Sequence, residues 1–168
     1  MYLRDTLLRM AEVNLYRVHW SQEILEGATR NLIEAGRMTN AKAVRLQKML
    51  ENAFPEAMVE VPTELVQVMS NDPGDRHVLA AAVVAKATVI VTYNLKHFPS
   101  VALNPWGVEA QHPDVFLTHL YDLSPDLVTD VIRQQAQALQ RPPLAFHELL
   151  SMLSKQVPEF ASKVQLHV

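Results

Sequence analysis

The 168-residue chain contains no cysteine and only four glycines. Without cysteine there is no disulfide framework, no thiolate zinc site and no cysteine nucleophile. The sequence has no glycine-rich phosphate-binding loop and no Gly-x-Ser-x-Gly motif, which excludes kinases, Rossmann dehydrogenases and α/β-hydrolases. Histidine pairs with the spacing of a zinc enzyme are also missing, so a zinc enzyme is disfavoured.

Long apolar runs are absent as well. The longest strongly apolar stretch, residues 78–84, is far too short to cross a bilayer. The first residues lack a basic-then-apolar pattern, so we expect a cytoplasmic protein with no membrane partner. Apolar residues make up 49% of the chain and charged residues 20%, a composition typical of a globular domain that buries a core.

The net charge of −3 is distributed unevenly along the chain. Residues 1–50 hold eight Lys or Arg against five acids, and residues 51–168 hold seven against thirteen. The basic part could attract phosphates while an acidic pocket elsewhere holds cations. Solvated helix faces explain the same distribution, and charge alone favours that interpretation.

Hydrophobic spacing and capping residues predict a series of helices. Apolar residues recur at helical spacing over residues 4–15. Ser21 is a good N-cap for the next helix, which Gly36 ends in a left-handed conformation. Thr39 or Asn40 caps a third helix, and every segment from residue 113 onward has a helical pattern.

Strand patterns lie between these helices. Alternating or β-branched runs predict short strands at residues 16–20, 57–61 and 88–92, with a weaker edge strand at 107–111. The run at 88–92 is apolar on both faces, as expected for a central parallel strand. The predicted fold class is therefore α/β with a central parallel sheet over residues 1–112, followed by a helical extension at 113–168.

The residues with the clearest chemical potential flank a buried helix and a strand. Asp72 and Asp75 bracket a Pro-Gly turn before the alanine-rich helix, and Thr92 and Asn94 follow the strand. Ligands of open α/β sheets bind outside the carboxyl ends of strands, and such oxygen donors suit Mg²⁺ or Mn²⁺. The alternative is purely structural, with Asp75 capping the helix and Asp72 starting the turn.

The stretch NDPGDRHVLAAAVVAKATVIVTYNLKHFP, residues 71–99, resembles the signature of PIN-domain proteins, particularly the VapC-like toxin branch. The resemblance extends through residues 3–12 and 20–25 and through the tail at 142–161. It implies a three-layer α/β/α PIN-like domain. It also implies a ribonuclease that depends on Mg²⁺ or Mn²⁺ and, as a toxin, is neutralised by an antitoxin protein.

The family's site residues map onto this chain one by one. Asp75 matches the metal-binding aspartate at the helix start, Asp72 matches its companion, and Asn94 stands where an acid often follows the threonine. A family acid on the second helix falls at Gly27, which makes the adjacent Glu26 the candidate ligand. A surface pair of Glu26 with Arg30 is the competing interpretation.

The resemblance is incomplete at the front of the chain. PIN domains open with a strand that ends in a metal-binding aspartate, whereas the predicted first helix begins here at about residue 3. We expect one of three explanations: a start codon assigned too late, a trimmed chain, or a strand supplied by another chain.

The sequence therefore predicts a metal-dependent endoribonuclease, the toxin of a toxin–antitoxin pair. The alternative is a catalytically degenerate PIN module that only binds RNA or a protein, and a DNA-directed nuclease is a weaker third hypothesis. Apolar faces of the later helices suit a homodimer, an antitoxin surface or a monomeric lid equally well. The candidates for binding the RNA backbone are Arg4, Arg9, Arg30 and Lys96. His97 is a further candidate for a phosphate contact. His77 could contact substrate, or it is a plain helix residue.

Overall fold

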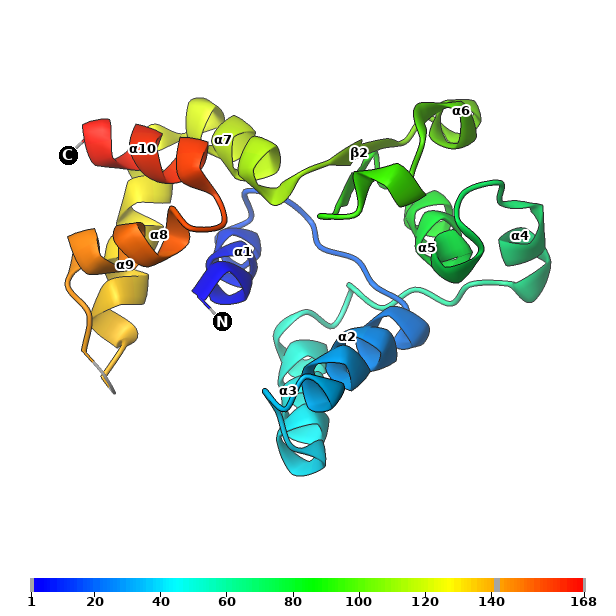
Figure 1. The fold of residues 1–168 in the computed structure, drawn as a ribbon, viewed down its shortest axis with the longest axis horizontal. Helices are drawn as coiled ribbons and strands as arrows, with labels where there is room; N and C mark the ends of the chain where they lie inside the picture. Colours follow the sequence, from blue (N-terminus) through cyan, green and yellow to red (C-terminus); the bar gives the residue numbers. More distant parts are fainter. Residues whose placement is uncertain (1, 141–142, 168) are drawn as a thin grey trace. The chain divides into compact units, whose positions relative to one another are not determined.

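The structure is a computed structural model that describes residues 2–140 and 143–167 (Figure 1). The chain divides into two compact units. One unit is Val18–Ala110, and the other joins the segment up to Arg17 with the segment from Gln111 onward. The predicted boundary after residue 112 puts the first helix in the same domain as residues 18–110. The two compact units instead group this helix with the carboxyl-terminal helices. The boundary itself stays a prediction.

The unit Val18–Ala110 contains short helices, 3-10 turns and strands. Its elements are α2 (Gln22–Glu34), α3 (Asn40–Ala53), α4 (Thr63–Val68), η1 (Pro73–Asp75), α5 (Arg76–Ala85), β1 (Val89–Val91), η2 (Leu95–His97), α6 (Ser100–Leu103), η3 (Asn104–Trp106) and the first residues of β2 (Glu109–Gln111).

Local capping explains where the helices of this unit begin and end. The Ser21 side chain accepts a hydrogen bond from Ile24 N (3.3 Å) and starts α2, and Thr39 caps α3 through Lys42 N (3.4 Å). Gly36 has φ +66°, a left-handed conformation that glycine adopts without strain. These predicted caps are confirmed.

The sheet consists of two parallel neighbours, β1 and β2. Glu109 N donates to Thr88 O (2.9 Å), which joins the start of β2 to the residue before β1. The predicted α/β class, with strands at 88–92 and 107–111, is confirmed.

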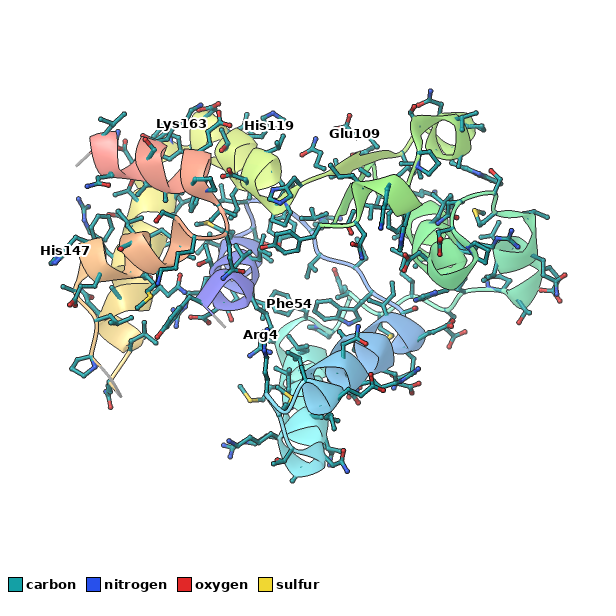
Figure 2. The ribbon with its side chains drawn as sticks, viewed as in Figure 1. Arg4, Phe54, Glu109, His119, His147 and Lys163 are labelled. Atoms are coloured by element: carbon teal, nitrogen blue, oxygen red, sulfur yellow. The ribbon has the colours of Figure 1, made fainter. Side chains whose placement is uncertain are left out.

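The predicted strands at 16–20 and 57–61 are wrong as regular strands. In the described residues they meet only at one isolated parallel bridge, Trp20 with Met58. Alternation of apolar and polar residues predicts which faces of a segment are buried, but a strand also needs a ladder of partners along its length. Trp20 is buried here and packs edge-on against Phe54, with ring centroids 5.7 Å apart (Phe54 is labelled in Figure 2).

The core of this unit forms where α5 packs on β1 and on α4. Leu79 of α5 is fully buried and Ile90 of β1 is nearly so. Phe98, just after η2, is also buried in this core (5% exposed) and therefore holds the segment that leaves β1 in place.

The second unit is a helical bundle made from both ends of the described chain. It comprises α1 (Tyr2–Glu12), α7 (Pro113–Leu123), α8 (Pro125–Ala138), α9 (Phe146–Leu153) and α10 (Pro158–Leu166). Helix α1 packs against α8 and α9, and α10 packs against α7. Leu3 and Met10 of α1 lie in one apolar core with residues of the other four helices.

The described helices give no candidate for a membrane span, because none combines the required length with sufficient apolar character.

Candidate functional site

The turn before α5 places two carboxylates at the start of that helix. Asp72 Oδ1 accepts a hydrogen bond from Gly74 N (3.0 Å), and Asp75 N donates to Asp72 O (2.9 Å). Aspartate favours such turns because its side chain binds the backbone two residues ahead, and Pro73 fits the first position of η1. Asp72 therefore has the turn-forming role that the structural alternative assigned to it.

Asp75, in contrast, is not used as a helix cap. Its side chain makes no capping hydrogen bond to α5, although it occupies the N-cap position. That carboxylate contacts His97 instead: Asp75 Oδ2 lies 2.6 Å from His97 Nδ1. The capping interpretation of Asp75 is thus wrong, and its carboxylate is turned toward a second segment of the chain.

The second segment is the exit of β1. Asn94 N donates to Thr92 Oγ1 (3.0 Å), and His97 N donates to Asn94 O (2.9 Å), which closes the 3-10 turn η2. This turn brings His97 back toward the start of α5, where its carbonyl accepts from Asp72 N (3.2 Å). The backbone of one segment is therefore bonded to the other at the place where their side chains meet.

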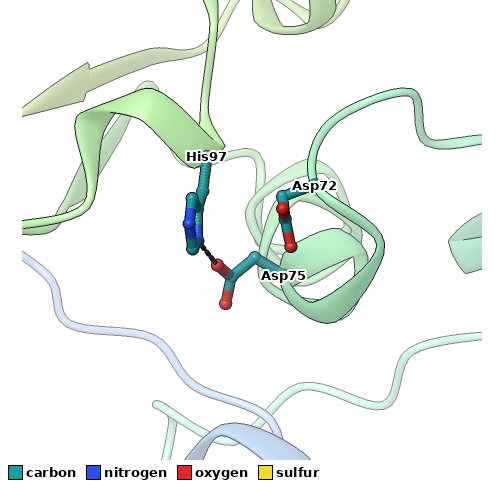
Figure 3. Close-up of side chains that lie close together, drawn as sticks. All are labelled: Asp72, Asp75 and His97. Atoms are coloured by element: carbon teal, nitrogen blue, oxygen red, sulfur yellow. Dashed lines mark hydrogen bonds and ion pairs between the residues drawn. The ribbon is translucent and has the colours of Figure 1, made fainter.

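Three side chains converge at this point (Figure 3). Asp72, Asp75 and His97 each offer one donor atom, and all three atoms lie within 4.8 Å of one another. The side chains of Asp75 and His97 are 28% and 29% exposed, so the cluster is accessible to a small ion or a substrate.

A buried amide lies on the same turn. Asn71 is 4% exposed and donates its Nδ2 to Asp75 O (3.0 Å), while its Oδ1 is buried without a hydrogen-bond partner. Buried oxygens are rarely left unpaired, so this atom has unused capacity to accept a donor or a cation.

The donor set fits a divalent cation. Carboxylate oxygens suit Mg²⁺ and Mn²⁺, and imidazole nitrogen suits transition-metal ions. Adjacent donors on an octahedral ion of this size are about 3 Å apart, since each metal–oxygen distance is about 2.1 Å. The three donor atoms, within 4.8 Å of one another, can therefore share one ion after small side-chain movements.

The remaining predicted site residues lie outside this cluster. Glu26 is exposed on α2, and its Oε1 accepts from Gln22 Nε2 (2.9 Å) rather than pairing with Arg30. The Thr92 hydroxyl bonds the Asn94 backbone, and Asn94 is exposed beside η2. The structure does not bring these three side chains into the described donor group, and their roles as ligands stay predictions.

His97 is the residue whose place in the cluster the sequence did not reveal. The sequence predicts that His97 and Lys96 contact phosphate. The position of His97 three residues after Asn94, at a strand exit, is the one sequence feature that indicates a place near the cluster. A second unforeseen pair links α2 and α5: Glu23 Oε1 lies 3.9 Å from His77 Nδ1.

Comparison with known proteins identifies the family of the chain. The PIN domain family model matches residues 3–96, and the VapC50 C-terminal domain model matches residues 113–166. The first match covers more than half of the chain, and the chain belongs to the PIN domain family, in its VapC-like branch.

One curated relative shows the similarity in detail. "Putative ribonuclease VapC50" of Mycobacterium tuberculosis (strain ATCC 25618 / H37Rv) is 48% identical over 102 residues, which are 61% of this chain and 60% of the relative. The match thus spans less than two thirds of the relative's length. No solved structure matches the chain.

Proposed function

We propose that this chain is a metal-dependent endoribonuclease and the toxin component of a toxin–antitoxin pair. The observation that carries the proposal is the convergence of Asp72, Asp75 and His97 between the exit of β1 and the start of α5. Membership of the PIN domain family supports the nuclease class, and the word "ribonuclease" in the relative's name supports RNA as the substrate.

The residues of the site have distinct tasks in this mechanism. Asp75 is the principal cation ligand, because its carboxylate makes no capping hydrogen bond to α5. Asp72, on the preceding turn, is the second carboxylate ligand. Mg²⁺ or Mn²⁺ held by these two carboxylates would polarise the phosphoryl group and lower the pKa of an attacking water. Thr92 and Asn94 orient water or metal at the strand exit, and Glu26 is retained as a further candidate ligand.

Partners follow from the same proposal. We expect RNA as the substrate and a cognate antitoxin protein as the inhibitor, with a homodimer as the candidate assembly. A cytoplasmic location remains part of the proposal.

Cleavage of RNA by the full chain tests the enzyme proposal. We expect the wild type to cut single-stranded RNA when Mn²⁺ or Mg²⁺ is added, and we expect chelation or Asp75→Asn to abolish cleavage. Glu60→Gln, at an exposed position elsewhere in the same unit, should cut like the wild type. Equal cleavage by Asp75→Asn and the wild type would remove Asp75 from the mechanism.

A degenerate PIN module that only binds RNA or a protein is the second candidate. The placement of Glu26 outside the donor cluster favours it, because fewer carboxylates then hold the cation. RNA binding without cleavage under any divalent ion would support this candidate. Competition between RNA and DNA substrates tests the third hypothesis, a DNA-directed nuclease.

A further inference from the structure

We propose that His97 supplies a nitrogen ligand to the cation of this site, through Nδ1. The site is then a mixed nitrogen–oxygen centre that prefers a divalent transition-metal ion, here Mn²⁺, to Mg²⁺. This inference rests on the proposed function in one respect only, because both place the cation in the cluster of Asp72, Asp75 and His97. It goes further by assigning the third donor and, from that donor, the choice of metal.

The backbone holds His97 in place for this role. Its carbonyl accepts from Asp72 N (3.2 Å), its own N–H is used in η2, and the next residue, Phe98, is anchored in the core. The backbone of His97 is therefore held in position on one side of the cluster, and the side chains of Asp72 and Asp75 come from the other segment. A ligand held by such surroundings loses little conformational entropy on binding.

The contact between His97 and Asp75 shows that the two donors already face each other. Nδ1 and Oδ2 are 2.6 Å apart, shorter than the spacing of about 3 Å expected for adjacent donors on one octahedral ion. Insertion of a cation requires these two atoms to separate by a few tenths of an ångström and replaces their hydrogen bond with two metal bonds. The partly exposed side chains leave room for that adjustment.

Asn71 holds the backbone of Asp75 beside the cluster. Its amide group is nine-tenths buried and bonded to the Asp75 carbonyl, yet Oδ1 has no partner.

The metal preference follows from the nitrogen donor. Mg²⁺ binds through oxygen and keeps several waters, whereas imidazole suits transition-metal ions. Replacing His97 with a carboxylate should therefore remove the preference while keeping the site. We expect the wild type to bind Mn²⁺ at least about tenfold more tightly than Mg²⁺, and His97→Asp to reduce that ratio about tenfold.

Pulsed electron paramagnetic resonance of Mn²⁺ added to the full chain tests the ligand directly. We expect nitrogen hyperfine coupling from a bound imidazole in the wild type, and its loss in His97→Gln together with a Kd for Mn²⁺ that rises about tenfold or more. His119→Gln is the matched control: it removes one imidazole from an exposed position on α7 and should change neither measurement (His119 is labelled in Figure 2).

Three outcomes would overturn the inference. The first is bound Mn²⁺ without nitrogen coupling in the wild type, a result that needs no variant to fold. The second is unchanged Mn²⁺ affinity in His97→Gln, and the third is unchanged affinity in Asp75→Asn, which would place the ion elsewhere. The same measurements distinguish failure of the proposed function from failure of this inference. If Mn²⁺ binds through nitrogen but RNA is not cleaved, the nuclease proposal is refuted and His97 remains a ligand. If RNA is cleaved but no nitrogen coupling is seen, the nuclease proposal stands and His97 is not a ligand.

Discussion

At the scale of single residues, Tyr16 joins α1 to α7 within the helical bundle. Its hydroxyl donates to Leu7 O (2.9 Å), and its ring meets Phe116 edge-on with centroids 5.0 Å apart. Desolvation by burial raises the pKa of Tyr16 above its ordinary value. The folded chain therefore keeps the phenol proton at a pH at which the unfolded chain releases it.

Tyr16→Phe tests this contact and its pH dependence. Loss of the hydrogen bond should lower the free energy of unfolding by about 1 kcal/mol at neutral pH. Because the folded-state pKa is raised, the wild type should also lose stability as the pH rises above about 10, by at most about 1.4 kcal/mol per pH unit. Urea denaturation between pH 8 and 11 should show a shallower alkaline decline for Tyr16→Phe, and parallel curves would contradict the prediction.

Lys86 ends α5 in a left-handed conformation, with φ +54°. A side chain in this region is strained, and Lys86 is exposed, so glycine loses no packing there. Lys86→Gly should raise the free energy of unfolding by about 0.5–1 kcal/mol, measured by thermal or denaturant unfolding. Lys86→Ala keeps the Cβ atom and should give no such gain; equal effects of the two substitutions would show that backbone strain is not the cause.

Lys96 lies exposed in η2 beside His97, where RNA phosphates would approach the cluster. In an Asp75→Asn background, which leaves the RNA intact, Lys96→Gln should weaken RNA binding. It should also lower the slope of log affinity against log salt by about 0.7. Lys48→Gln, an exposed change on α3, serves as the control and should leave the slope unchanged. An unaltered slope in Lys96→Gln would remove this residue from the RNA contact.

At the scale of elements, a buried polar network fixes α1 against α8. Thr6 Oγ1 donates to Gln135 Oε1 (2.8 Å), and Gln135 Nε2 donates to Tyr2 O (3.1 Å). Thr6 and Gln135 are both 0% exposed, so neither can exchange its partner for bulk water. The register of the two helices therefore depends on matched polar groups as well as on apolar packing.

A double-mutant cycle measures this network. Thr6→Val should cost about 1–3 kcal/mol of unfolding free energy, because it leaves the buried Gln135 Oε1 unpaired. Adding Gln135→Leu removes the orphaned oxygen, so the double variant should lose less than the sum of the two single losses, by at least about 0.5 kcal/mol. Additive losses would mean that the two side chains do not depend on each other.

The elements also show what sequence patterns can predict. Helices were predictable because periodic apolar residues and local caps such as Ser21 and Thr39 act within a few residues. The strands at 16–20 and 57–61 were not, because their pairing depends on which distant segments lie beside them. Only the bridge between Trp20 and Met58 remains of that expectation in the described structure.

The candidate site was predictable to a similar extent. Asp72 and Asp75 could be recognised from the turn, the helix start and the following strand. His97 could not, because its approach to Asp75 requires the 3-10 turn η2 and the burial of Phe98, both of which depend on tertiary packing. Glu26 was placed by resemblance, and a shift of one position on a helix rotates a side chain by about 100°.

At the scale of the whole molecule, the helical bundle needs both ends of the chain. Leu3 and Met10 are 5% and 0% exposed because α1 is packed among the carboxyl-terminal helices. The family match over residues 3–96 therefore includes a helix whose apolar face is covered by the segment from residue 111 onward. A chain that ends at residue 112 leaves this face open.

Removal of residues 113–168 tests this dependence. The shortened chain should bind the dye ANS and self-associate, because α1 loses the residues that cover its apolar side. Hydrogen exchange should be fast in α1 of the shortened chain and slow in the full chain. A monomer of residues 1–112 that binds no dye and protects α1 would instead support the predicted boundary after residue 112.

The joining of α1 with α8 and α9 also determines the order of events during synthesis. Helix α1 emerges from the ribosome before any of the helices that cover it, and a single amphipathic helix of 11 residues is only marginally stable in water. It can complete its packing only after more than a hundred further residues have been translated. The two units can thus mature at different times: residues 18–110 can collapse while the nascent chain is still growing, and the bundle closes last.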